Sequence, residues 1–201
     1  MSVLGKARIE SLLKETAIKE RLIVTPLLSM EQIQSASIDI RLGHDFTTTR
    51  KGNLPYIDAS ESNFEPHRHQ SRHYVNRAER FFLHPHDLVL TSTLEYFRLP
   101  ITVSGWVTSR SRWGRAGLVI ATATAVHPGF TGAITLELLN LGEVPLVLYP
   151  GLRVAQLILT DAEGASEYQG RFNFQVDAYH ADVSEETQLD YEFWKPRKPG
   201  P

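Results

Sequence analysis

The stretch SRSRWGR, residues Ser109–Arg115, places three arginines and two serines within seven positions. Residues 96–136 contain no Asp or Glu, so no carboxylate nearby in the sequence neutralises Arg110, Arg112 and Arg115. Guanidinium groups match phosphate oxygens, and serine hydroxyls, or the N–H groups of a helical turn opening here, would add donors. We therefore interpret the stretch as a polyanion site. The alternative is that the arginines cover a surface and pair with carboxylates from distant parts of the chain.

Glu137 is the first carboxylate after this acid-free run, and it lies in the apolar segment AITLELLN. In a strand, Ile134, Leu136 and Leu138 would face one side, while Thr135 and Glu137 would face the other. A carboxylate on such a mixed face, partly desolvated and close to an arginine, is suited to act as a general base. An ordinary exposed strand glutamate is the alternative interpretation.

The eight histidines include HRH at 67–69 and HPH at 84–86, and alternate histidines on a strand can share a face and bind metal. Neither group has a third ligand at a fixed spacing, which favours a solvated loop. Zinc nucleoside deaminases use a His-x-Glu motif and usually a Pro-Cys-x-x-Cys motif. This chain has no His-x-Glu and no cysteine, so we expect no protein-bound metal and no zinc chemistry.

Length and composition narrow the class of protein. The 201 residues suit one domain, placed at residues 1–175, with a polar tail at 176–201. A net charge of −2 argues against a nucleic-acid coat or a basic membrane-surface protein. The sequence has no apolar run of membrane-spanning length and no signal-peptide pattern. The absence of cysteine excludes disulfides and a thiol nucleophile, and we expect a cytoplasmic protein.

The elements that must position these residues are mostly strands. A short helix is predicted over 5–15, where Ile9, Leu12 and Leu13 share one face. Glycine- and proline-rich turns separate apolar segments, which favours an all-β barrel or sandwich. A polar, aperiodic stretch at 63–79 is predicted to be an exposed loop. The predicted strands are 35–43 (half-buried and ending at Gly43), 86–100, 101–109, 116–126, 133–142, 146–151 and 153–160.

Several of these segments occur in the order found in one enzyme family. They are SASIDIRLG, FFLHPHDLVLTSTLEYFRLP, GWVTSRSRWGRAGL, HPGFTGAITLELLNLGEVPLVLYPGLRVAQLIL and EYQG. The chain resembles the dCTP deaminases of the trimeric dUTPase-like superfamily from about Ile9 to Arg171. The resemblance implies a distorted β-barrel of β-clip or jelly-roll-like type with a short N-terminal helix. It also implies a homotrimer with sites at subunit interfaces.

The resemblance also implies roles for individual residues. Glu137 would be the general base for the water that attacks C4 of cytosine, turning dCTP into dUTP and ammonia. Ser111 and Arg115 would complete the catalytic set, and Arg110 would meet the triphosphate. Mg²⁺ would arrive on the triphosphate, without a protein cage. The implied nucleotide-binding residues are Arg110, Ser111, Arg112, Arg115, His127, Thr135, Leu136, Gln156, Tyr168 and Arg171.

The sequence departs from the family pattern at four positions. Arg112 stands where many members have a second serine, and His127 replaces an aspartate that holds the sugar 3′-hydroxyl. The closing motif is Glu167-Tyr168-Gln169-Gly170-Arg171, with an acid in place of a phosphate-binding lysine and an arginine in place of a glutamine. His127 weakens the case for pyrophosphate cleavage. A bifunctional or dUTPase-like enzyme, one acting on another nucleotide, and a nucleotide-binding regulator without turnover remain alternatives.

Overall fold

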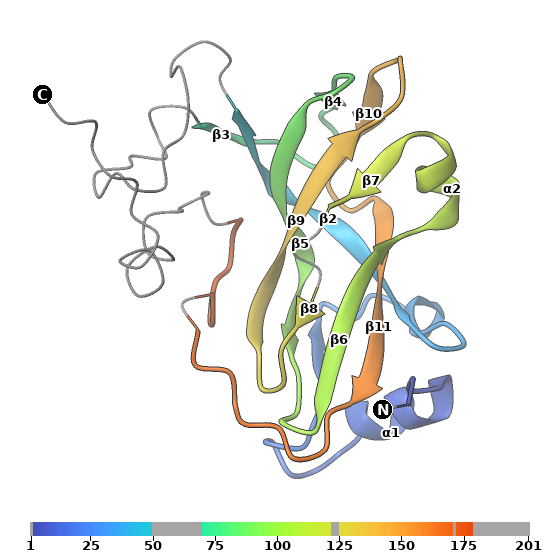
Figure 1. The fold of residues 1–201 in the computed structure, drawn as a ribbon, viewed down its shortest axis with the longest axis vertical. Helices are drawn as coiled ribbons and strands as arrows, with labels where there is room; N and C mark the ends of the chain where they lie inside the picture. The colour runs from blue at the N-terminus through green and yellow to red at the C-terminus, as the bar shows by residue number, and fades with distance from the viewer. Residues whose placement is uncertain (1, 50–69, 122–124, 171, 179–201) are drawn as a thin grey trace, which may run out of the picture.

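The computed structural model describes residues 2–49, 70–121, 125–170 and 172–178. Over these residues the chain forms a curled sheet of nine strands and a separate two-stranded sheet (Figure 1). No helix in the described part of the chain is long and apolar enough to cross a membrane. The elements in order are α1 (Lys6–Leu13), β1 (Ile23–Thr25), the 3-10 helix η1 (Met30–Gln32), β2 (Ile38–Thr49), β3 (Gln70–Tyr74), β4 (Phe81–Leu83), β5 (Leu88–Arg98), β6 (Val103–Ser109), α2 (Ser111–Arg115), β7 (Leu118–Ile120), β8 (Ala125–Val126), β9 (Thr131–Asn140), β10 (Leu146–Leu148) and β11 (Arg153–Asp161).

The large sheet curls until strands from opposite ends of its order meet. Its strand order is β7-β9-β5-β2-β11-β6-β8, with β1 added to β5 and β3 to β2. Although β7 and β6 lie near opposite ends, the backbone N–H of Ile120 donates to Ser109 Oγ at 3.0 Å. Helix α2 connects these two strands at the same place (Figure 1). The predicted all-β class, with a distorted barrel-like sheet and a short N-terminal helix, is confirmed.

Apolar side chains from both halves of the curled sheet form one continuous core. Along β9, Ile134, Leu136 and Leu138 are buried in this core, whereas Thr135 and Glu137 are half-buried on the other face. The alternation predicted for this segment is therefore confirmed, and it holds the Glu137 side chain out of the core.

Strand β2 differs from its prediction in length and in burial. It continues past Gly43 to Thr49, with a pairing irregularity against β5 between Leu42 and Phe46. A Cβ on Gly43 would lie 2.7 Å from Ser92 Oγ and 2.9 Å from Ser92 O, so glycine permits the close approach of β5 rather than ending the strand. The strand is not half-buried either, because other elements cover its polar face as well.

The observed strands differ from the predicted ones in three further respects. The segment 116–126 forms two short strands, with β7 pairing with β9 and β8 pairing with β6. Strand β3 lies inside the stretch predicted to be a loop, and it pairs with β2 while most of its side chains stay exposed. The short strands β1 and β4 were not predicted. The boundary at residue 175 stays a prediction, and residues 179–201 of the tail lie outside the described residues.

Candidate functional site

The arginine-rich stretch starts where β6 ends. The Arg110 backbone N–H donates to Val154 O at 2.9 Å, which fixes the end of β6 against β11. The Arg110 carbonyl then accepts N–H groups from Trp113 at 2.9 Å and Gly114 at 3.0 Å, which forms the single turn of α2. The helical turn that the sequence suggested is therefore present, and its arginine side chains project at the surface.

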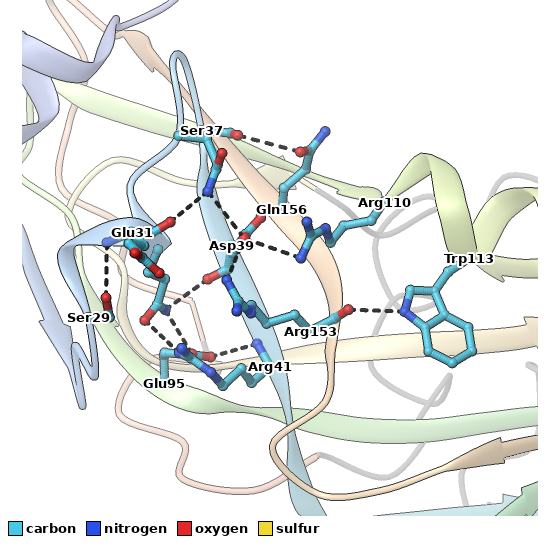
Figure 2. A network of polar contacts seen from close by, with 12 residues as sticks. Ser29, Glu31, Ser37, Asp39, Arg41, Glu95, Arg110, Trp113, Arg153 and Gln156 are labelled. Carbon is cyan, nitrogen blue, oxygen red and sulfur yellow. Dashed lines mark hydrogen bonds and ion pairs between the residues drawn. The ribbon is translucent and has the colours of Figure 1, made fainter.

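A pocket of about 310 Å³ opens beside α2. It brings together four residues of the predicted set, from α2, from β11 and from the position after β6. Figure 2 shows Arg110 and Gln156 among them. Two further residues in its wall, Trp113 and Arg153, were not predicted. The lining residues are Arg110, Ser111, Arg112, Trp113, Arg153 and Gln156.

Asp39 on β2 lies beneath two of these arginines. Its Oδ2 is 3.2 Å from Arg110 Nη1 and 3.4 Å from Arg153 Nη1. For Arg110, the alternative interpretation therefore holds in part, because its guanidinium pairs with a carboxylate that is distant in the sequence. No described carboxylate forms an ion pair with Arg112 or Arg115, which are exposed. Three guanidinium groups against one carboxylate leave the pocket positively charged.

The Arg153 side chain lies in the wall of the pocket because β11 has an irregularity in its pairing with β2. Along β11, Arg153 pairs with Arg41, Ala155 with Ile40 and Gln156 with Asp39, so the register shifts between Arg153 and Ala155. Simple alternation would place the side chains of Arg153 and Gln156 on opposite faces of the strand. An extra residue in one strand brings such side chains to the same face. The indole N–H of Trp113 donates to Arg153 O at 3.0 Å and ties this irregularity to α2. In the sequence, the only indication that Arg153 could belong to the pocket is that it lies three positions before Gln156.

A second group of predicted residues lies along β9 and the turn before it. The rings of His127 and Tyr168 stack with centroids 5.1 Å apart, and the Tyr168 N–H donates to Pro128 O at 3.0 Å. The Gln175 amide donates to Thr135 Oγ1 at 3.2 Å. Leu136 is 1% exposed and its side chain lies in the core, so this side chain cannot contact a ligand.

Glu137 belongs to this second group and does not line the pocket. Its carbonyl accepts the N–H of Ala121 at 2.8 Å, which holds its backbone in place. Within the described residues, no hydrogen bond or ion pair joins its side chain to Ser111 or Arg115. Within one chain, the predicted site residues therefore lie in two separate groups, one lining the pocket and one along β9 and the turn before it.

The remaining predicted residues fall outside both groups. Arg171 and the histidines at 67–69 lie outside the described residues. Among the described residues, no cluster of three His, Asp or Glu side chains suits a metal ion. Arg115 belongs to α2 but does not line the pocket.

The fold and the pocket together define an all-β protein with a cationic pocket suited in charge to a phosphate chain. A model of the dCTP deaminase-like family matches residues 3–162. The dUMP-forming dCTP deaminase of Methanobrevibacter smithii is 34% identical over 199 residues, which cover 97% of this chain and 100% of that protein. The dCTP deaminase of Halorubrum lacusprofundi is 42% identical over 148 residues, covering 73% and 72%. The chain therefore belongs to the dCTP deaminase-like family.

A solved structure supports the fold. The 2′-deoxycytidine 5′-triphosphate deaminase of Agrobacterium tumefaciens aligns with a TM-score of 0.58 at 21% identity. The alignment covers 80% of this chain and 48% of that one, so this chain spans about half of its length.

Proposed function

We propose that the protein hydrolyses dCTP to dUTP and ammonia. The observation that carries this proposal is the pocket that gathers Arg110, Ser111, Arg112 and Gln156 in a chain of the dCTP deaminase-like family. Guanidinium groups bind phosphate oxygens through two parallel hydrogen bonds, so the arginines are suited to hold the triphosphate. We propose a cytoplasmic role in pyrimidine deoxynucleotide metabolism.

In the proposed reaction, Glu137 takes a proton from water as the water oxygen bonds to C4 of cytosine. The proton taken by Glu137 passes to N4, and the C4–N4 bond breaks as ammonia leaves. The second proton of the water moves from the added oxygen to N3, so C4 becomes a carbonyl group. Ser111 and Arg115 donate hydrogen bonds that hold the base and stabilise charge at the reacting centre. The half-buried position of Glu137 on β9 supports this role, because its side chain is outside the core.

We propose that Mg²⁺ enters on the triphosphate and that the reaction needs no zinc. The pocket offers mainly cationic and neutral donors, which suit phosphate oxygens, whereas Mg²⁺ prefers oxygen ligands such as carboxylates. The sequence lacks both motifs by which zinc deaminases hold and use their metal.

The test of this function is incubation of the full-length protein with dCTP and Mg²⁺. Loss of cytosine absorbance and release of ammonia support the proposal. A protein that shows a thermal shift with dCTP but releases no ammonia would be a nucleotide-binding regulator, and the proposed activity would be wrong.

We further propose that each active site combines residues of two subunits of a homotrimer. The separation of Glu137 from the pocket within one chain supports this arrangement. Glu137→Gln and Ser111→Ala subunits are each expected to be inactive, but unfolding and reassembling them together is expected to restore part of the deamination. In a mixed trimer, some interfaces pair an intact Ser111 with an intact Glu137. A mixture as inactive as its components, or a native mass other than that of a trimer, would contradict this assembly.

The expected product is dUTP, without pyrophosphate. The resemblance implies that the aspartate at this position also handles the attacking water in dUTPases. Its replacement by His127 therefore supports deamination alone. The alternative, formation of dUMP, is favoured by the name of the M. smithii relative, which matches 97% of this chain. Separate assays of ammonia and pyrophosphate on the same dCTP reaction decide between them. Equal amounts of ammonia and pyrophosphate, with dUMP as product, would show that His127 does not prevent the second hydrolysis.

A further inference from the structure

Asp39 lies at the point where two arginines of the pocket converge. Its side chain belongs to a residue with only 1% of its surface exposed. Oδ2 faces Arg110 Nη1 and Arg153 Nη1 (Figure 2). It also accepts a hydrogen bond from the Gln34 amide at 3.5 Å. Oδ1 is buried and has no hydrogen-bond partner among the described residues. The buried charge is therefore compensated through Oδ2, chiefly by the two guanidinium groups.

The charge of Asp39 explains how two cations can share one wall of the pocket. Arg110 and Arg153 each have a nitrogen within 3.4 Å of the same oxygen, so their two positive charges lie near each other and repel. A carboxylate between them turns this repulsion into attraction. The arginine side chains remain 37% and 43% exposed, and each guanidinium has five N–H donors, so donors remain for a ligand.

The carboxylate is itself held on a rigid support. The Asp39 carbonyl accepts a hydrogen bond from Gln32 Nε2 at 2.8 Å, and the same nitrogen donates to the buried Glu95 at 2.8 Å. On the Arg153 side of the pocket, the Trp113 indole N–H donates to the Arg153 carbonyl and fixes the Arg153 backbone. Both arginines are therefore oriented before a ligand arrives, which lowers the entropy cost of binding.

We propose that Asp39 is a positioning residue that fixes Arg110 and Arg153 in the geometry that binds the phosphate chain. It does so from beneath the pocket, without touching the substrate. The inference deepens the proposed function, since it rests on the same pocket as the triphosphate site, but it concerns anion binding and not the deamination step.

The variant Asp39→Asn separates positioning from simple charge neutralisation, because the two roles predict opposite signs. Removing a negative charge makes the pocket more positive, which by itself tightens the binding of an anion. Loss of the two ion pairs instead releases both arginines, and we expect the Kd for inorganic triphosphate to rise about 10-fold, as for a lost charge-assisted hydrogen bond. With dCTP, KM is expected to rise with kcat unchanged, because the reacting atoms are not affected.

Asp45→Asn is the matched control. Asp45 lies on the same strand, is also nearly buried, and pairs with Arg72 at 2.8 Å, away from the pocket. The control removes the same charge, and the Kd for inorganic triphosphate is expected to stay at the wild-type value. Where Asp39→Asn does not fold by circular dichroism, Asp39→Glu keeps the charge but moves the oxygens, and the same rise in Kd is expected.

Calorimetric titration of the full-length protein with inorganic triphosphate decides the proposal. Unchanged or tighter binding by the folded Asp39 variant would overturn it, as would an equal rise in Kd for Asp45→Asn. Wild-type protein that fails to bind inorganic triphosphate would overturn the anion pocket itself. Binding without release of ammonia from dCTP would overturn only the proposed deaminase activity.

Discussion

Glu137→Gln is expected to reduce kcat for deamination of dCTP by about 10²- to 10⁴-fold, the range that a general base contributes. Glutamine keeps the size and polarity of the side chain, but its amide cannot accept a proton from water at neutral pH. Nucleotide binding is expected to survive, because the pocket that gathers the arginines does not include this residue. The loss should therefore appear in kcat, with little change in KM.

The fold should tolerate this change, so the loss of activity can be assigned to chemistry. Ile134, Leu136 and Leu138 anchor β9 in the core, and the Glu137 carbonyl keeps its bond to Ala121 in the variant. The Glu137 side chain adds nothing to that core. Thermal unfolding of Glu137→Gln should therefore match that of the wild-type protein.

Ammonia release at saturating dCTP is the measurement, with Glu143→Gln as control. Glu143 is exposed in the connection that follows β9, so the control removes the same charge a few residues away. Its kcat is expected to equal that of the wild-type protein. Undiminished turnover by Glu137→Gln would remove Glu137 from the mechanism, and an equal loss in Glu143→Gln would assign the effect to net charge.

Local sequence patterns predicted the parts of the site that depend on a single segment. The arginines around Ser111 predicted an anion site, and Arg110 and Arg112 line a pocket there, although anion binding stays a prediction. Alternation placed the Glu137 side chain outside the core. Both inferences use side-chain spacing along one strand or turn, which the backbone geometry fixes directly. The role of Glu137 as a general base stays a prediction.

The remaining features depend on contacts between distant segments. Alternation predicts that Asp39 and Arg41 face solvent, yet both are buried, because Gln32 of η1 and Glu95 of β5 cover that face. Arg153 reaches the pocket only because β11 shifts its register. Strand β3 lacks a hydrophobic pattern because most of its side chains are exposed, so only its pairing with β2 identifies it.

Arg41→Met is expected to be the most damaging substitution for stability. Arg41 Nη1 lies 2.8 Å from Glu95 Oε1, and the Arg41 backbone N–H donates to Glu95 Oε2 at 2.9 Å. Glu95 is completely buried, and Arg41 is 8% exposed. Removing one partner leaves a buried charge without its counter-ion, which costs about 3–5 kcal/mol of unfolding free energy. Urea unfolding of the wild-type and variant proteins measures this loss.

The acid dependence of this loss identifies its cause. Burial raises the pKa of Glu95 above its ordinary value, while the hydrogen bonds from Arg41 act in the opposite direction. Removing the guanidinium therefore raises this pKa further. A folded-state pKa above the unfolded one means that the folded protein binds the extra proton, so the contribution of Glu95 to stability falls as pH rises through that interval. The difference between Arg41→Met and wild type should be largest at neutral pH and shrink in acid.

A double variant separates an unpaired charge from a simple loss of packing. Arg41→Met combined with Glu95→Leu removes both charges and fills the site with apolar atoms, a replacement that is often neutral or stabilising for buried pairs. Stability between that of Arg41→Met and wild type is expected, because the Arg41 backbone N–H and Gln32 Oε1 lose their partners while no unpaired charge remains. The acid dependence of the single variant should be absent. The freed Gln32 amide still donates to the Asp39 carbonyl, so the support beneath the pocket remains. A double variant as unstable as Arg41→Met would instead show that the arginine stabilises the fold through its packing against β2 and its neighbours.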